Sequence, residues 1–198
     1  MTAGRSLSPE PTPSDEQVSS VVALFSGGLD STALVYSLLH DDVTVHGFGV
    51  DYGQAHVEEL RYAAATAERL DISYAVWPAP AMHGVGAENI YPNRNGVLIS
   101  LAATYALAVE AQAVAIGCNA DDAADYLDCR PAYLDAWQPV LAFHGLTLLH
   151  PFTSTWKKDI VATSRQNGWP VEDSRSCYLA GDPCGTCPAC TVRAAALA

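Results

Sequence analysis

Basic residues are scarce in this chain, which has 10 lysines and arginines against 22 acidic residues and a formal net charge of −12 over 198 residues. Binding along a nucleic-acid backbone needs clustered basic side chains, so the balance disfavours a nucleic-acid partner. No apolar run approaches the roughly 18 residues of a membrane span. Residues 1–17, rich in proline, serine and acids, lack a signal-peptide core. We expect a cytoplasmic protein with no membrane partner, and a flexible tail over 1–17.

Charged residues are few overall, at 16%, whereas hydrophobic residues make up 49%. This composition excludes a disordered chain, and the length suits a single domain, which we place at 18–198. Apolar segments alternate with helical patterns and predict βαβ units. The predicted strands are 18–25, 43–50, 73–77, 113–117 and 146–150, and the predicted helices are 31–40, 58–70, 94–110, 156–167 and one beginning near Pro131. The fold class is therefore α/β, a doubly wound, mostly parallel sheet with ligand sites at the carboxyl ends of its strands.

A pair of glycines joins the first strand to the first helix, in the run Phe25-Ser26-Gly27-Gly28-Leu29-Asp30-Ser31-Thr32. Such a turn presents free backbone N–H groups and a helix N-terminus, which together suit a phosphate. Gly27 and Gly28 let the backbone take positive φ and approach a ligand closely. We also expect Ser31 or Thr32 to cap the helix or bind phosphate, and Asp30 to bind magnesium. An ordinary turn with a serine cap is the alternative, and the complete order of residues favours nucleotide binding.

Four of the six cysteines, Cys177, Cys184, Cys187 and Cys190, lie within 14 positions of one another near the C-terminus. Glycines and prolines between them allow the tight turns that bring thiolates together. This spacing favours a structural tetrahedral Zn²⁺ site in a segment, 177–190, that packs on the same domain. Disulfides and an iron–sulfur cluster are the alternatives. The other two thiols, Cys118 and Cys129, are expected to be packing residues.

Polar side chains gather directly after several predicted strands. They lie in 51–56, 93–95, 117–130 and 150–158. Each stretch has a simpler interpretation as a turn, a helix cap or a solvated face. Since the carboxyl ends of parallel strands meet at one edge of the sheet, the same edge as the glycine turn, we expect these stretches to form one site.

The stretch 26–31 resembles the phosphate loop of the adenine-nucleotide alpha-hydrolases, the PP-loop ATP pyrophosphatases. Those enzymes cleave ATP between its α and β phosphates. Together with Asp51-Tyr52-Gly53-Gln54-x-His56, Arg94-Asn95, Asp128-Cys129-Arg130 and the four spaced cysteines, the chain from Val21 to Ala196 resembles the 7-cyano-7-deazaguanine (preQ0) synthase family.

This resemblance implies ATP-dependent conversion of 7-carboxy-7-deazaguanine and ammonia to the nitrile, through an adenylated carboxylate and an amide. It implies ATP, Mg²⁺ and Zn²⁺ as cofactors and a homodimer as the assembly. The residues implied in catalysis are Asp30, Arg94, Arg130, Lys157 and His56, with the arginines and the lysine neutralising carboxylate or phosphate charge and His56 carrying protons. The residues implied in substrate binding are Tyr52, Gln54, Asn95, Asp121 and Asp128.

Two stretches depart from the pattern of that family. The segment between Trp77 and Arg94 is shorter than usual and ends in Tyr91-Pro92-Asn93 rather than Pro-Gly, and 123–126 replaces a Phe-Ser-Gly-Tyr-like run. Both stretches are expected to border the substrate. A relative that stops at the amide, one that attaches a deazapurine to another acceptor, a tRNA-modifying ATP pyrophosphatase and a non-catalytic nucleotide-binding subunit therefore stay open as alternatives.

Overall fold

The computed structural model describes residues 18–82, 91–179 and 181–198, so the expected tail lies outside the described residues. The first half of the chain contains β1 (Ser20–Leu24), α1 (Leu29–His40), β2 (Thr44–Asp51), α2 (Glu59–Arg69), β3 (Ser73–Pro78), α3 (Arg94–Ala108) and β4 (Ala113–Ala115). The second half contains α4 (Ala120–Asp125), the 3-10 turn η1 (Leu127–Cys129), α5 (Pro131–Asp135), α6 (Gln138–Ala142), β5 (Thr147–Leu149), α7 (Lys157–Gln166), the 3-10 turn η2 (Val171–Asp173) and α8 (Pro188–Leu197). Among the described residues, no helix is long and apolar enough to cross a membrane.

Within the described part of the chain, five parallel strands form one sheet in the order β3-β2-β1-β4-β5. The chain builds outward from β1 through β2 to β3, then crosses to the other side of β1 with β4 and β5. The strand order therefore reverses between β1 and β4. In open sheets of this kind the crevice at the carboxyl end of that reversal is where ligands bind. The doubly wound parallel fold predicted from the sequence is confirmed.

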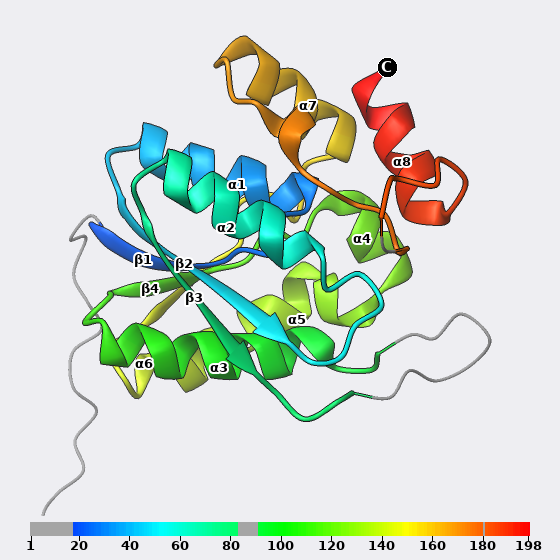
Figure 1. Cartoon of the computed structure of the whole chain (residues 1–198). Helices are drawn as coiled ribbons and strands as arrows, with labels where there is room; N and C mark the ends of the chain where they lie inside the picture. The colour runs from blue at the N-terminus through cyan, green and yellow to red at the C-terminus, as the bar shows by residue number, and fades with distance from the viewer. Residues whose placement is uncertain (1–17, 83–90, 180) are drawn as a thin grey trace, which may run out of the picture.

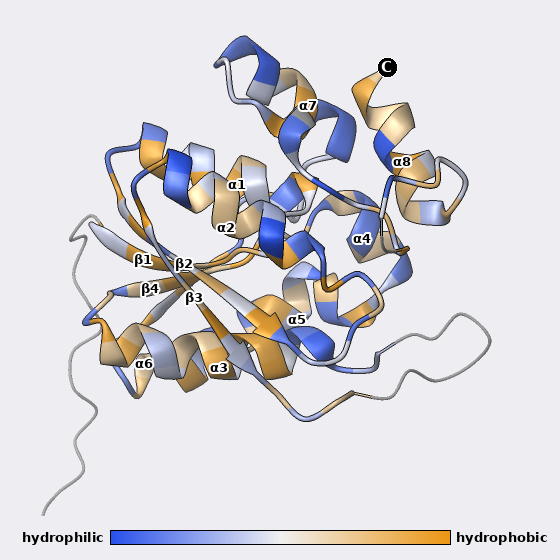
Figure 2. Ribbon diagram, in the orientation of Figure 1, coloured by the Kyte–Doolittle hydropathy of each residue, from blue (hydrophilic) through white to orange (hydrophobic). Residues whose placement is uncertain are grey.

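Helices cover both faces of the sheet, with α1 and α2 on one face and α3, α5 and α6 on the other (Figure 1). The alternation of side chains along β1 explains the two layers. Val21 and Ala23 are buried among residues of α1 and α2, and Val22 and Leu24 are buried among residues of α3. Hydrophobic colouring accordingly runs along the central strands in Figure 2. A third cluster, Leu29, Ala33, Ile160, Val161 and Val171, packs α7 against α1.

Several short elements were not predicted from the sequence. The strand predicted at 113–117 ends at Ala115, and α4 begins five residues later, where the Asn119 side chain accepts a hydrogen bond from the Asp122 N–H. The helices α6 and α8 begin with Pro139 and Pro188 in their first turns. The same proline signal correctly predicted the start of α5 at Pro131.

Candidate active site and metal centre

The glycine turn packs its backbone directly onto the start of α2. Gly27 has φ +86°, and a Cβ added to it would lie 2.2 Å from the carbonyl oxygen of Glu59. Gly28 has φ −71°, so only Gly27 uses the positive φ that the two glycines permit. Gly28 is instead the residue that precedes α1. Only glycine fits at Gly27, both for its dihedral angle and for its close backbone contact.

The helix α1 begins at Leu29, two residues before the predicted start, and this changes the roles of the hydroxyl side chains. The Ser31 hydroxyl donates to the carbonyl of Gly28 at 3.1 Å and lies 3.2 Å from the Ser26 hydroxyl. Thr32 is buried inside the helix. The N-cap residue is Gly28, which has no side chain to accept a hydrogen bond from the first turn. The expectation that Ser31 or Thr32 caps this helix is therefore wrong. The first N–H groups of α1 are left available to an anion.

Replacing Gly27 with alanine should destabilise the protein more than a comparable change elsewhere. Positive φ costs a non-glycine residue about 1–3 kcal/mol, and here the new Cβ also collides with the α2 backbone. Gly145 is the matched control, because it has φ +69° but nothing within 4 Å of an added Cβ. Thermal unfolding should show a clearly larger loss for Gly27→Ala than for Gly145→Ala. Equal losses would show that the α2 backbone yields to the new methyl group.

A cavity of about 250 Å³ opens at the carboxyl ends of the strands, next to the glycine turn. Its lining includes polar residues from the glycine turn and from each of the four polar stretches that follow predicted strands. They are Ser26, Asp30 and Ser31 from the turn, Tyr52, Gln54 and His56 after β2, Arg94 and Asn95 at the start of α3, Asp122 in α4, and Lys157 at the start of α7. Phe25, Gly28 and Leu29 complete the part contributed by the turn. The reversal of strand order thus gathers these residues in one place.

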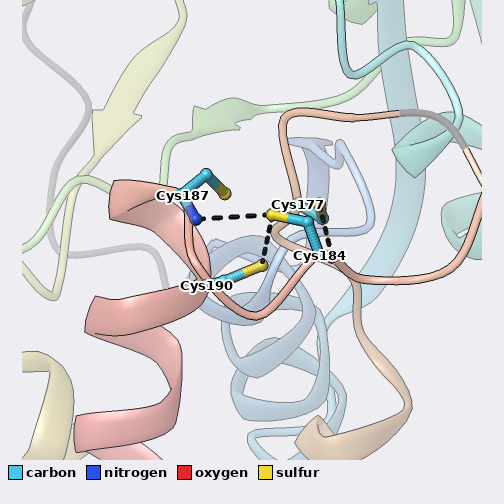
Figure 3. A group of neighbouring side chains, drawn as sticks. All are labelled: Cys177, Cys184, Cys187 and Cys190. Carbon is cyan, nitrogen blue, oxygen red and sulfur yellow. Dashed lines mark hydrogen bonds between the residues drawn. The ribbon is translucent and has the colours of Figure 1, made fainter.

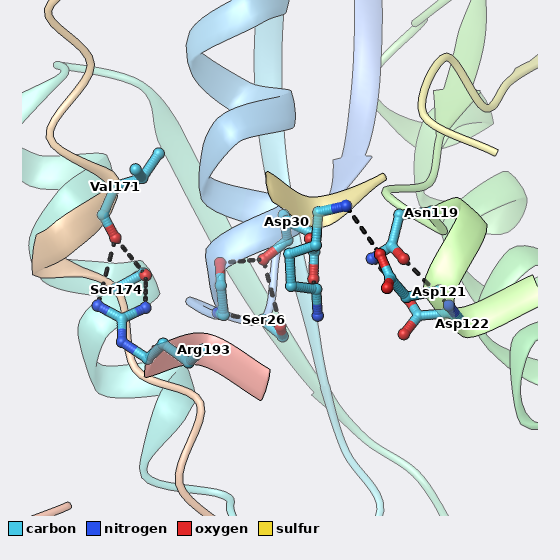
Figure 4. A network of polar contacts seen from close by, with 11 residues as sticks. Ser26, Asp30, Asn119, Asp121, Asp122, Val171, Ser174 and Arg193 are labelled. Atoms are coloured by element: carbon cyan, nitrogen blue, oxygen red, sulfur yellow. Dashed lines mark hydrogen bonds and ion pairs between the residues drawn. The ribbon is translucent and has the colours of Figure 1, made fainter. Parts of the chain in front are cut away.

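Asp30, labelled in Figure 4, forms an ion pair with Lys157, whose Nζ lies 3.0 Å from Oδ2, and both residues line the cavity. The other carboxylate oxygen, Oδ1, is buried and has no hydrogen-bond partner among the described residues. Burial raises the pKa of Asp30, and the cationic Lys157 opposes that shift. Burial also raises the pKa of the nearby Asp122 to about 6. An unpartnered carboxylate oxygen next to a second carboxyl group is a donor set that suits Mg²⁺.

Arg94 provides a second, permanent positive charge in the cavity. Burial acts to lower the pKa of Arg94, but the nearby Tyr52 and Cys129 outweigh it, and the pKa is raised above its ordinary value. Burial, together with the positive charge of Arg94, lowers the pKa of His56 to about 4. His56 is therefore neutral near pH 7, which limits its predicted role as a proton carrier to the neutral imidazole.

Two of the predicted substrate-binding residues line the cavity but use their amide groups within the fold. The Gln54 amide accepts from the Tyr52 N–H at 2.8 Å and donates to the Val50 carbonyl at 3.0 Å. The Asn95 side-chain nitrogen donates to the Cys129 sulfur at 3.2 Å and to the Cys118 sulfur at 3.4 Å. These bonds shape the loop after β2 and the start of α3. Cys118 and Cys129 are buried, and both also line the cavity.

Five predicted site residues do not line this cavity, namely Gly27, Thr32, Asp121, Asp128 and Arg130. Asp121 accepts from the backbone N–H of Lys157 at 2.8 Å, and Asp128 accepts from the backbone N–H of Asn95 at 2.9 Å. Each carboxylate therefore caps the first turn of a helix that carries a cation into the cavity. Arg130 is exposed, and its Nε donates to the Ala123 carbonyl at 3.2 Å.

Sequence reasoning missed Glu59 and Tyr178 as lining residues of the cavity, and it singled out Asp122 only as part of 117–130. Glu59 is buried, with 8% of its surface exposed, and burial raises its pKa to about 8. A glutamate at the start of a helix is ordinarily exposed to solvent and interacts favourably with the helix dipole. The residue type alone therefore did not indicate a place in the cavity. The available clue was its position three residues after His56, at the point where the loop that follows β2 enters α2.

The four clustered cysteines converge on one point (Figure 3), with their sulfur atoms all within 4.8 Å of one another. Zinc–sulfur bonds of 2.3 Å in a tetrahedron place the sulfurs ~3.8 Å apart, and the sulfurs of Cys184 and Cys190 lie 3.9 Å apart. The backbone N–H groups of Thr186 and Cys187 lower the pKa of Cys184 to about 6, whereas burial raises that of Cys190 to about 12. A bound cation would allow all four thiols to ionise together. The cluster fits a metal ion.

The cysteine segment also forms part of the cavity wall. The N–H of Arg175 donates to the carbonyl of Gly27 at 2.9 Å, which ties the segment to the glycine turn. The N–H of Gly181 donates to the Glu58 carboxylate at 2.9 Å. Ser176 and Tyr178 then line the cavity beside the turn. The four-cysteine segment is therefore tied to the glycine turn and to the end of the loop before α2 by direct hydrogen bonds.

Comparison with solved structures supports the fold. An NH3-dependent NAD synthetase from Campylobacter jejuni subsp. jejuni aligns with a TM-score of 0.56 at 18% identity, over 80% of this chain and 68% of that chain. The U34-tRNA thiolase NcsA from Methanococcus maripaludis, solved with its 4Fe-4S cluster, aligns with a TM-score of 0.55 at 14% identity, over 91% of this chain and 64% of that chain. At these identities the likeness concerns the fold alone.

Comparison of sequences is more specific. The 7-cyano-7-deazaguanine synthase of Synechococcus sp. (strain RCC307) is 35% identical over 209 residues, covering 90% of this chain and 94% of that protein. The protein of the same name in Rhizobium rhizogenes (strain K84 / ATCC BAA-868) is 30% identical, covering 87% of this chain and 84% of that protein. The family model described as queuosine biosynthesis protein QueC matches residues 20–91 and 82–198. These matches confirm the resemblance found in the sequence, and the chain belongs to the QueC family.

Proposed function

We propose that this chain is a 7-cyano-7-deazaguanine synthase, which uses ATP and ammonia to convert 7-carboxy-7-deazaguanine to preQ0. The observation that carries the proposal is one cavity that is lined both by the glycine turn and by Arg94. The turn suits the phosphates of ATP, and the guanidinium suits a carboxylate. The relatives named 7-cyano-7-deazaguanine synthase support this choice of substrate.

The chemistry explains why an acid of this kind needs ATP. A carboxylate resists ammonia because its leaving group would be oxide. Transfer of AMP to a carboxylate oxygen releases pyrophosphate and creates a good leaving group, so that ammonia gives the amide and AMP. Transfer of a second AMP to the amide oxygen, followed by loss of protons and AMP, gives the nitrile. Positioning of the reactants and neutralisation of charge supply most of the rate enhancement in such transfers.

In this proposal the N–H groups of residues 26–31 bind the phosphates of ATP. Asp30, through its unpartnered oxygen, and Asp122 would hold Mg²⁺, whose charge offsets that of the phosphates. Lys157, paired with Asp30 at 3.0 Å, contributes a further positive charge on the same side of the cavity. The carboxylate of the substrate binds to Arg94, and Tyr52 and neutral His56 border it.

Zn²⁺ is the metal that we propose for the four cysteines. A site closed by four thiolates has no open position for water, so its role is structural. Residues 175–178 connect it to the glycine turn and to the cavity, so the metal fixes one wall of the active site. We also propose the homodimer implied by the family resemblance, which light scattering of the metal-loaded protein would test.

Lys157→Met should slow the reaction, because it removes a charge that opposes the negative charge of the transferring phosphate. We expect kcat to fall roughly 10²–10³-fold, the usual effect of losing one charge-stabilising donor. Lys158→Met is the matched control, since Lys158 is the exposed neighbour on the same helix and does not line the cavity. Steady-state release of pyrophosphate measures both variants. Equal effects of the two changes would remove Lys157 from the proposed site.

The function is tested by incubating the zinc-loaded protein with MgATP, ammonium and 7-carboxy-7-deazaguanine and identifying the product by mass spectrometry. The proposal predicts the nitrile. Accumulation of the amide alone would favour a relative that stops after one activation. Absence of any product, despite binding of ATP, would contradict the proposed reaction.

A further inference from the structure

The further inference concerns Glu59, the first residue of α2 and a buried acid in the wall of the cavity. Its carboxylate reaches the glycine turn, because an added Cβ on Gly28 would lie 3.5 Å from its Oε2. Ser26, in the glycine turn, acts to lower the pKa of its carboxyl group and also lines the cavity. The carboxyl group is therefore placed beside the atoms that the proposed function assigns to phosphate binding.

Glu59 faces both halves of the proposed reaction. Its carboxylate lies close to the glycine turn, where ATP would bind, and Arg94, where the acid would bind, acts to lower its pKa. AMP transfer must join a carboxylate oxygen held near Arg94 to the phosphate held near the turn. The carbon that ammonia attacks therefore lies in the space between these groups, and Glu59 borders that space.

We infer that Glu59 is the general base that accepts protons from nitrogen as the amide and then the nitrile form. The inference rests on the proposed function and goes beyond it by assigning a residue to these proton transfers. In the first step ammonia nitrogen bonds to the acyl carbon, the bond from that carbon to the AMP oxygen breaks, and the surplus N–H proton passes to the carboxylate. In the second step the adenylated amide loses its N–H protons in turn, the carbon–oxygen bond to AMP breaks, and the nitrile is left.

The surroundings of Glu59 suit exchange of a proton near neutral pH. Burial is the largest influence and raises its pKa to about 8, whereas Arg94 and Arg175 act to lower it. The charged or titratable groups that act on it come from several elements and are Asp30, Tyr52, Arg94, Arg175 and Tyr178. A base is most effective when its pKa lies near the working pH. His56, with a pKa of about 4, is a weaker base in the same cavity.

Asp122 is the other acid in the cavity that titrates near neutral pH, with a pKa of about 6. Its strongest charged neighbours are Asp30 and Lys157, followed by Arg94. In the proposed function it belongs to the region that holds phosphate and magnesium. Glu59 is therefore the acid placed to accept a proton from the attacking nitrogen.

The test compares Glu59→Gln and Glu59→Asp with wild type and with Glu68→Gln, a control on the exposed side of the same helix. Nitrile formation is measured against pH at equal concentrations of unprotonated ammonia, because the fraction of free ammonia itself changes with pH. Adenylation is followed separately, as exchange of labelled pyrophosphate into ATP that depends on the acid but not on ammonia.

Glu59→Gln should lower kcat for the nitrile about 10²–10⁴-fold, the usual range for loss of a general base. It should also lose the rise of activity with pH that accompanies ionisation of Glu59, and keep acid-dependent exchange close to wild type. Glu59→Asp should retain part of the activity and a rise at a shifted pH. Glu68→Gln should match wild type throughout.

The inference is overturned if Glu59→Gln keeps the wild-type pH profile and rate, or if exchange falls as steeply as nitrile formation. If Glu59→Gln fails to fold, Glu59→Asp decides: an unshifted wild-type profile overturns the inference, and a shifted rise supports it. Failure of the proposed function would give a different result, because the wild-type protein itself would then make no nitrile from the acid.

Discussion

Arg94→Met is expected to reduce kcat/KM for the deazaguanine acid by roughly 10³-fold while the protein stays folded. Arg94 lies at the first position of α3 and lines the same cavity as the glycine turn. Its pKa is raised, so it carries a full positive charge wherever the protein is folded. In the proposed binding mode, removing Arg94 takes away the cation that binds the substrate's carboxylate inside the cavity.

Two further variants separate charge from geometry at this position. Arg94→Lys keeps the charge but loses the two-pronged donor geometry, so we expect an intermediate loss of activity. Arg61→Met is the control, because Arg61 is exposed on α2 and does not line the cavity. Thermal unfolding of each variant checks that it folds. Arg94→Met with the activity of Arg61→Met would remove Arg94 from the acid-binding role.

Removal of the metal is expected to abolish activity by disordering the wall that the cysteine segment forms. Structural zinc contributes on the order of 10–16 kcal/mol in isolated small sites, which is comparable with the whole stability of an ordinary domain. In the proposed site the metal joins the four thiols of this segment, whose sulfurs lie within 4.8 Å of one another. Without it, the contact from the Arg175 N–H to the Gly27 carbonyl has no fixed donor, and the glycine turn loosens.

Cys184→Ser and treatment with a chelator should therefore give the same three results. Metal content should fall, amide hydrogen exchange should rise in both 175–190 and the glycine turn, and ATP should bind more weakly. Cys118→Ser is the control for metal content, because Cys118 lies outside the cluster and should leave the metal bound. A metal-free protein with wild-type exchange in the glycine turn would show that the two sites are independent.

The long elements and the two sequence motifs could be predicted because each is encoded by neighbouring residues. Five strand patterns, the run 26–31 and the cysteine spacing all follow from local sequence, and the parallel α/β fold and the convergence of the four sulfurs agree with them. A cluster of four cysteines within one short segment leaves little freedom in how its sulfurs meet. The glycine turn is likewise determined by the strand before it and the helix after it.

The composition of the cavity could not be predicted as well, because it depends on which way each side chain points. Asp121 and Asp128 were chosen as acids near the site, but both cap helices that deliver Lys157 and Asn95 to it. Their effect on the site is therefore to position other residues. Glu59 was missed for the opposite reason, since burial of an acid at a helix start is set by tertiary packing onto the glycine turn.

The dihedral angles of the two glycines show the same limit at a smaller scale. Consecutive glycines permit positive φ at either position, and the sequence does not say which uses it. In the structure Gly27 needs the unusual angle, because its Cα lies against the α2 backbone. Gly28 has ordinary extended geometry and precedes the helix. The distinction comes from the neighbouring helix rather than from the turn.

Transfer of labelled oxygen from the acid tests the central claim most directly. The protein is given 7-carboxy-7-deazaguanine with both carboxylate oxygens replaced by oxygen-18, together with MgATP and ammonium, and the AMP is analysed by mass spectrometry. If AMP is joined first to the carboxylate and then to the amide, each nitrile is accompanied by two molecules of AMP that each carry one heavy oxygen. Formation of ADP and labelled phosphate, or of nitrile with unlabelled AMP, would contradict activation by AMP transfer in this cavity.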